Sequence, residues 1–156
     1  MYHCASAAAL LASTSEHKSP ALASSALLSS QHGGAITWSS KRQATVALST
    51  VEAEYVAMSQ CAQQMAWMHS WLDKVEIEYS QLGLIKGDNH GAIALTKNMK
   101  DHGKVKHIDI QHHYIRDLIQ SGAIQLEQVP SSENLADLFT KPLQKPFAST
   151  ASMKWT

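Results

Sequence analysis

Three acidic residues stand where predicted strands and helices begin or end, and they are the strongest candidates for chemistry. Glu52 opens a helical pattern after Ser49-Thr50-Val51, Asp88 follows an apolar run, and Asp137 lies in a segment that follows Pro130. Carboxylates gathered from distant segments repel one another, so a fold that collects them usually does so around hard divalent cations, which prefer oxygen ligands. The pattern indicates a pair of Mg²⁺ ions acting on a phosphodiester.

Each of these acids also has a purely structural explanation. Ser49 and Glu52 fit a capping box, in which Glu52 reaches back to the backbone N–H of Ser49. Asp88 can cap the helix that follows it, with Asn89 as a rival cap. Asp137 can be a solvated helix acid. We expect Glu54, which faces elsewhere on the helix, to be a solvated surface acid.

The elements that must position these acids are readable from residue 35 onward. Two β-prone runs, 35–39 and 45–49, are separated by a basic turn and predict a hairpin. Apolar residues recur at helical spacing from Thr50 to Lys74, namely Val51, Tyr55, Met58, Ala62, Met65 and Leu72, whereas Trp67 and Trp71 lie off this stripe. Further segments predict a strand over 82–86, a helix over 89–97, a helix over 104–120, a strand over 123–129 and a last helix that carries Asp137. This order predicts a mixed α/β fold.

The first 32 residues differ in texture from the rest of the chain. Residues 1–32 are rich in Ser, Ala and Leu and show neither period, which predicts a poorly ordered or weakly helical segment. The apolar run Ala7 to Ala12 is far shorter than the ~20 residues of a membrane span and lacks the basic flank of a secretory signal. Cys4 and Cys61 are too few for a disulfide framework. We therefore expect an intracellular protein of the cytoplasm or nucleus, neither secreted nor bound to membranes.

Composition limits how the chain could bind a nucleic acid. The 156 residues suffice for one domain with a real core, and 13 Lys plus Arg balance 13 Asp plus Glu. Binding must therefore come from local patches. Lys41, Arg42 and Gln43 in the predicted turn, with Trp38 before them, could grip a backbone, although a basic turn is also an ordinary solubility feature. Asn89, together with His113 and Arg116 on the outward face of a helix, completes this candidate set.

Four runs of sequence carry a resemblance to a known family: Gly33 to Gln43, Thr45 to Tyr55, Lys106 to Ile110, and Leu135 to Leu143. Together they resemble the ribonuclease H domain that ends the polyprotein of copia-type LTR retrotransposons. The resemblance implies an α/β fold with a ribonuclease H-like mixed sheet and flanking helices over 33–143, followed by a tail over 144–156. It implies Glu52, Asp88 and Asp137 as catalytic ligands of Mg²⁺ or Mn²⁺. The implied substrate is an RNA/DNA hybrid or RNA, and the implied partner is the reverse transcriptase portion of the same polyprotein.

The start of the chain departs from this family. The family's first strand is central and carries the first catalytic Asp in an Asp-Ala-Asp-Trp type motif, which counting back from Gly34 places near Leu11 to Thr14. This chain has no acid there. We therefore predict that the first, central strand is missing or degenerate and that the hydrolase is impaired. The alternatives are a non-catalytic nucleic-acid-binding module and an inert retroelement fragment.

Overall fold

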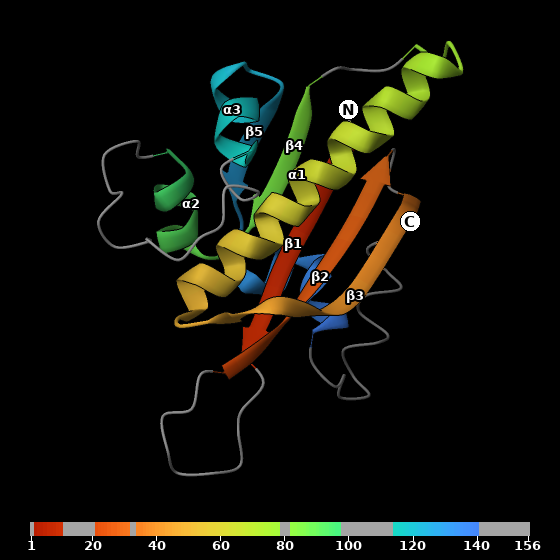
Figure 1. Cartoon of the computed structure of the whole chain (residues 1–156). Helices are drawn as coiled ribbons and strands as arrows, with labels where there is room; N and C mark the ends of the chain where they lie inside the picture. Colours follow the sequence, from red (N-terminus) through yellow and green to blue (C-terminus); the bar gives the residue numbers. More distant parts are fainter. Residues whose placement is uncertain (1, 11–20, 32–33, 79–81, 98–113, 141–156) are drawn as a thin grey trace.

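Five strands form one mixed sheet in the order β3-β2-β1-β4-β5 (Figure 1). The computed structural model describes residues 2–10, 21–31, 34–78, 82–97 and 114–140. The strands are β1 (Tyr2–Leu10), β2 (Ala21–Gln31), β3 (Gly34–Ala47), β4 (Gly83–Gly87) and β5 (Ile124–Gln128). β2 pairs antiparallel with both β1 and β3, whereas β4 pairs parallel with both β1 and β5. The predicted mixed sheet with flanking helices is confirmed.

Helices lie on both faces of this sheet. The helical elements are α1 (Thr50–Lys74), α2 (His90–Lys97), α3 (Tyr114–Gln120) and two 3₁₀ turns, η2 (Ser131–Glu133) and η3 (Leu135–Phe139). α1 runs along β1 on one face (Figure 1). η3 packs on the other face, because Ala136 contacts Ala7 and Ala26, whereas Cys4 and Leu27 belong to the cluster under α1. Side chains alternate between the two faces along each strand, which explains this division.

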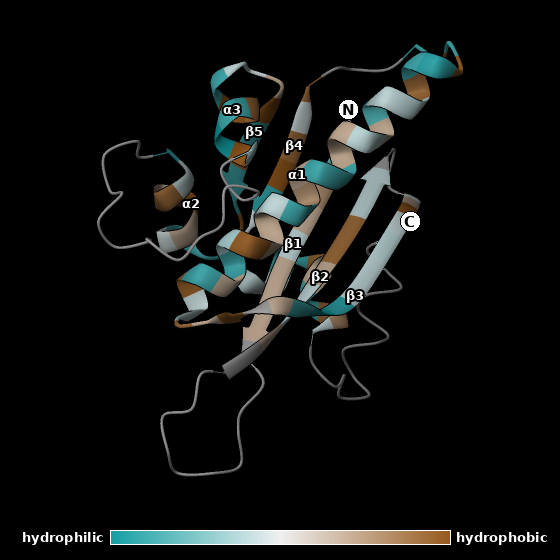
Figure 2. Ribbon diagram, viewed as in Figure 1, coloured by the Kyte–Doolittle hydropathy of each residue, from teal (hydrophilic) through white to brown (hydrophobic). Residues whose placement is uncertain are grey.

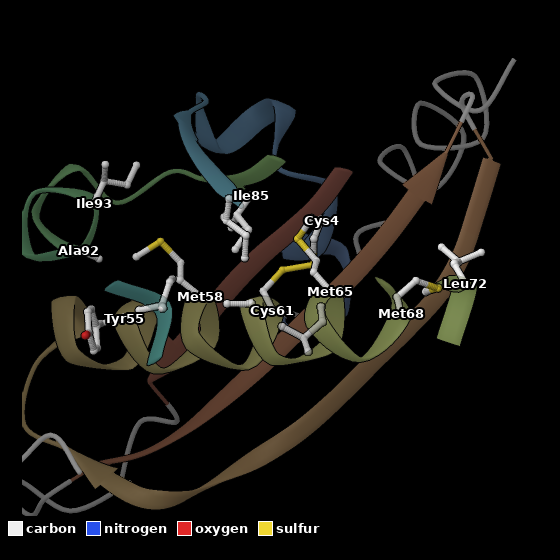
Figure 3. Close-up of a cluster of buried hydrophobic side chains, with 14 residues drawn as sticks. Cys4, Tyr55, Met58, Cys61, Met65, Met68, Leu72, Ile85, Ala92 and Ile93 are labelled. Carbon is white, nitrogen blue, oxygen red and sulfur yellow. A yellow bond between two sulfur atoms is a disulfide. The ribbon is translucent and has the colours of Figure 1, made fainter. Parts of the chain in front are cut away.

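The main core lies between α1 and the sheet (Figure 3). Five of the predicted stripe residues are buried, namely Tyr55, Met58, Ala62, Met65 and Leu72, and Val51 is half-buried. Trp67 and Trp71 keep 59% and 47% of their surface exposed, as their position off the stripe predicted. Figure 2 shows hydrophilic residues along the outward surface of α1, so the predicted amphipathic helix Thr50 to Lys74 is confirmed.

The N-terminal segment is ordered differently from the prediction. Residues 1–32 were expected to be poorly ordered or weakly helical, yet they hold β1 and β2. β1 occupies the centre of the sheet, so the first strand is present in a degenerate form that is rich in Ala and Ser. β2 pairs with β1 along nearly its whole length and β4 pairs with its first half, and this tertiary pairing overrides the helix propensity of alanine. Leu11 to Thr14, where the missing acid was counted, lie outside the described residues.

Two other predicted elements also need correction. β3 is one strand of 14 residues, so the basic run 40–43 lies inside a strand and not at a hairpin tip. Asp137 lies in a 3₁₀ turn and not in an α-helix. The predictions for β4, α2 and β5 agree with the structure to within one residue. Of the helix predicted over 104–120, only the part from Tyr114 falls in the described residues.

A covalent bond joins the central strand to the long helix. Cys4 on β1 and Cys61 on α1 are both fully buried and form a disulfide, with their Cα atoms 6.4 Å apart (Figure 3). Two cysteines were too few for a framework, but they make one cross-link inside the core. Among the described helices, none combines the length and apolarity that crossing a bilayer would require.

Candidate metal-binding edge of the sheet

The candidate site lies at the carboxyl ends of the parallel strands β1 and β4. Ala5 pairs with Lys86, and continuing this register by two residues places Ala7 beside Asp88, directly after β4. Ligands of open α/β sheets bind at the carboxyl ends of strands. The Asp88 carboxylate accepts a hydrogen bond of 2.6 Å from the Ser131 hydroxyl, which connects the end of β4 to η2.

Glu52 serves as a helix cap in this structure. Its backbone N–H donates to Ser49 Oγ at 3.1 Å, and its carboxylate accepts from the backbone N–H of Leu48 at 2.8 Å. The expected capping box is therefore present, with Leu48 in place of Ser49 as the donor to Glu52. These contacts keep the Glu52 carboxylate at the N-terminus of α1. Its predicted role as a metal ligand gains no support from them.

Glu54 is the acid of α1 that faces the sheet. It was expected to be a solvated surface residue, but only 7% of its surface is exposed, and its Oε1 accepts the backbone N–H of Ala8 at 3.0 Å. The sequence held a signal for this position: Glu54 precedes Met58 by four residues and Cys61 by seven, which places it on the apolar stripe. A carboxylate on such a stripe is buried against whatever the helix packs on.

Asp137 approaches the same strand from the opposite face. Asn134, the cap of η3, donates from Nδ2 to the carbonyl of Ser6 at 2.8 Å, and Ala136 packs on Ala7. Asp137, the next residue, is half-buried, and its carboxylate accepts a hydrogen bond from the Thr140 hydroxyl at 3.4 Å. η3 is therefore fixed to the segment of β1 that runs beside Asp88.

Three elements that carry acids thus meet at one short stretch of β1. Asp88 follows β4 at the level of Ala7 in the strand register, and Glu54 accepts a hydrogen bond from Ala8 on the α1 face. The turn η3, which carries Asp137, packs on Ala7 through Ala136 on the other face. β1 itself contributes no acid at this point. Within the described ranges, no three His, Cys, Asp or Glu side chains are close enough together to hold a metal ion. The donors are hard oxygens, which suit Mg²⁺ or Mn²⁺, but the set lacks an anion from the central strand.

Solved structures with the same fold are ribonucleases H. RNase H1 from the halophilic archaeon Halobacterium salinarum aligns with a TM-score of 0.58 and 16% identity, over 88% of this chain and 92% of that one. LC11-RNase H1 in complex with an RNA/DNA hybrid aligns with a TM-score of 0.57 and 14% identity, over 89% and 93%. At such identities the likeness shows the fold alone. No family model matches the chain.

Relatives found by sequence similarity are Pol polyproteins of plant retrotransposons. The retrovirus-related Pol polyprotein from transposon TNT 1-94 of Nicotiana tabacum is 38% identical over 109 residues, and that from transposon RE1 of Arabidopsis thaliana is 40% identical over 110 residues. Each match covers 70% of this chain. The chain is a ribonuclease H-like domain of the retrotransposon Pol kind. Each match spans only 8% of the relative's own length. The resemblance drawn from the sequence motifs is confirmed.

The predicted basic grip on nucleic acid is not a single cluster in this domain. Lys41 and Arg42 are exposed, but they point to opposite faces of the sheet, because successive strand residues alternate. Gln43 is buried, and its Nε2 donates to Ser25 Oγ at 2.7 Å and to the carbonyl of Ala53 at 2.8 Å. The predicted surface role of Gln43 is therefore wrong. Its amide instead ties β3 to β2 and α1.

The other predicted nucleic-acid contacts also have structural partners. Asn89 caps α2, since its Oδ1 accepts the backbone N–H of Ala92 at 3.1 Å. Arg116 was predicted to point outward, but it is half-buried: its Nη2 donates to the carbonyl of Leu95 at 3.0 Å, and its guanidinium lies 5.8 Å from the Tyr55 ring centroid. Burial raises the pKa of the Tyr55 hydroxyl, and the Arg116 charge opposes that rise. His113 lies outside the described residues.

Proposed function

We propose that this domain binds an RNA/DNA hybrid at the carboxyl ends of β1 and β4, and that this edge is an impaired form of a two-metal hydrolytic centre. The observation that carries the proposal is the meeting of α1, the end of β4 and η3, which bear Glu54, Asp88 and Asp137, on the stretch of β1 that contains Ala7. One of the structural neighbours is a ribonuclease H1 in complex with an RNA/DNA hybrid, which supports this choice of substrate class.

The helix carboxylate of the proposed site is Glu54. Glu52, the residue predicted from the sequence, is occupied as a cap at the N-terminus of α1. Glu54 is two residues further along the helix and contacts the central strand directly. Asp88 and Asp137 keep the roles predicted for them. The proposed set is therefore Glu54, Asp88 and Asp137.

The protein's own contribution to the chemistry is to hold these anions in place. Glu54, Asp88 and Asp137 would have to draw closer together to share a Mg²⁺ or Mn²⁺ ion, which would supply activation of water and stabilisation of the leaving oxygen of a phosphodiester. Ser131 orients Asp88, the Ala8 N–H orients Glu54, and Asn134 fixes η3 beside β1. These contacts hold the three elements in place before any substrate arrives.

Ala7 is the position at which the site falls short. It lies beside Asp88 in the strand register and against η3, so a carboxylate there would lie next to Asp88 on the face of the sheet that carries η3 and Asp137, whereas Glu54 approaches β1 from the α1 face. Alanine supplies no anion. Because each ~1.4 kcal/mol of lost transition-state stabilisation slows a reaction tenfold, the loss of one ligand worth several kcal/mol leaves very little hydrolysis.

The lack of an acid on β1 also favours a second candidate function, a module that holds a hybrid without cutting it. In an intact element the reverse transcriptase portion of the same polyprotein would be its partner. The relatives are Pol polyproteins of which this domain covers a small part, and this supports such a context.

A labelled hybrid tests the proposal. The full chain is mixed with an RNA/DNA hybrid, and separately with a DNA duplex of the same sequence, with Mg²⁺ or with a chelator. We expect retention of the hybrid, with slow Mg²⁺-dependent cleavage of its RNA strand or none. Cleavage as fast as that of an active ribonuclease H would contradict the impairment. Failure to retain or cut the hybrid would contradict the nucleic-acid role and leave an inert fragment.

A further inference from the structure

Two connections hold the central strand to the long helix along one seam. The Cys4–Cys61 disulfide is one, and the hydrogen bond from the Ala8 N–H to the Glu54 carboxylate is the other. The two points are seven residues apart on α1, about 10 Å, and four residues apart on β1, about 13 Å. α1 therefore lies along β1 in the opposite direction, with the disulfide at one end of the seam and Glu54 at the other.

Little else on the strand side grips the helix between these points. The side chains that β1 turns toward α1 are those of Cys4, Ser6 and Ala8, all small. Ser6 is fully buried, and its hydroxyl has no hydrogen-bond partner in the described part of the chain. Small side chains offer few dispersion contacts. The disulfide therefore contributes a larger part of the stability of the contact between β1 and α1 than it would in a core of branched side chains.

We propose that the Cys4–Cys61 disulfide is a redox-sensitive clamp that fixes β1 against α1 and so sets the position of Glu54 at the strand's carboxyl end. Reduction removes the covalent connection across a sequence separation of 57 residues and leaves the seam to its weak contacts. The evidence for the clamp is the disulfide and the small side chains between β1 and α1. Only its consequence for metal binding rests on the proposed function.

The exchange is an ordinary thiol–disulfide reaction. The Cys4 and Cys61 thiols together reduce one molecule of glutathione disulfide, giving the protein disulfide and two glutathione thiols, and the reverse reaction regenerates the dithiol. Attack by a thiolate needs access, and both sulfurs are buried. Exchange therefore requires a local opening of the seam.

The test compares the full chain equilibrated in oxidised and in reduced glutathione buffers, with Cys61→Ser in both as the matched control. Thermal unfolding gives the Tm, and native-state hydrogen exchange gives the protection of the Ala8 amide, the donor to Glu54. We expect the oxidised chain to melt on the order of 10 °C above the reduced chain and to protect the Ala8 amide more strongly. Cys61→Ser should show no redox dependence.

Equal Tm values and equal Ala8 protection in the two buffers would overturn the clamp. So would two thiols that still titrate after unfolding of the oxidised sample. Mn²⁺ binding, measured in the same samples, separates this inference from the proposed function. If neither sample binds Mn²⁺ but the redox shift of Tm and of Ala8 protection persists, the proposed metal site fails and the clamp stands. If Cys61→Ser does not fold, the oxidised and reduced forms of the natural chain still decide the question.

Discussion

At the scale of single residues, two glutamates two positions apart have opposite roles. Glu52 lies at the helix cap, and Glu54 lies against the central strand. Glu52 was predicted to be a metal ligand, with the capping contact as the structural alternative, and the structure shows the capping contact. Glu54 was predicted to be a solvated surface acid and is instead buried. The spacing of Glu54 from Met58 and Cys61 was the better guide, since position on a helical stripe decides which acid is buried.

Alanine substitutions separate these roles. Glu54→Ala leaves the partly buried Ala8 N–H without its acceptor, which should cost about 1–3 kcal/mol of unfolding free energy and speed hydrogen exchange at Ala8. Glu52→Ala, the matched control, should cost about 0.3–1.5 kcal/mol and speed exchange at Leu48 only. Denaturant unfolding and amide exchange measure both effects. Faster exchange at Ala8 in Glu52→Ala would contradict the assignment.

Protonation of a half-buried histidine should make the domain less stable in mild acid. Burial lowers the pKa of His69, and the nearby Asp73 carboxylate opposes that shift. The unfolded chain then binds a proton more readily than the native one, so the contribution of neutral His69 is complete above the unfolded pKa of about 6.5 and is lost as pH falls below it. Urea midpoints at pH 7.5 and 5.5 should differ less in His69→Gln. An unchanged pH dependence in that variant would refute this origin.

At the scale of elements, the helix and the short strands were predictable and the first strand was not. α1 has a repeated apolar stripe and a cap, both of which are local signals. β1 has no such signal, because its Ala and Ser side chains favour no strand locally and its stability comes from partners distant in sequence. The continuous β3 was misread for a related reason: a basic run in the sequence looks like a turn, whereas pairing with β2 carries the strand through it.

Substitutions on the two faces of α1 test its packing. Met65→Ala and Leu72→Ala remove buried side chains and should each cost about 2–5 kcal/mol of unfolding free energy. Trp67→Ala and Trp71→Ala, on the exposed face, should stay within about 0.5 kcal/mol of the natural chain. Denaturant unfolding compares the four. Losses of similar size on both faces would show that α1 is not packed as described.

At the scale of the whole molecule, the sheet order decides where the domain begins. The sequence resemblance started at Gly33, and the predicted domain was 33–143. The structure instead puts β1 and β2 inside the sheet, with β1 at its centre. The motifs could not reveal that β1 and β2 belong to the sheet, because residues 1–32 contain none of them. Strand pairing uses backbone groups, and small side chains of many kinds are compatible with it.

A truncated chain shows the consequence. A variant that starts at Gly34 lacks both β1 and β2. β4 then loses its β1 partner, and β3 is separated from the rest of the sheet. We expect it to lose cooperative unfolding and near-ultraviolet circular dichroism, because unpaired buried strand edges cannot be satisfied. A cooperative melt close to that of the full chain would show that residues 33–143 form the domain alone.

The most direct test of the account is the rise in Tm that Mg²⁺ gives to Ala7→Asp. This substitution puts a carboxylate beside Asp88 and against η3, on the face of the sheet that carries Asp137. A ligand that binds only the folded chain stabilises it by mass action. Asn has nearly the same size as Asp but carries no charge, so Ala7→Asn controls for crowding at position 7. We predict that Mg²⁺ raises the Tm of Ala7→Asp well above the shift seen in Ala7→Asn and the natural chain, and that Asp88→Asn abolishes this gain. Equal Mg²⁺ shifts in Ala7→Asp and Ala7→Asn would contradict the proposal that a carboxylate at position 7 completes a metal site with Asp88.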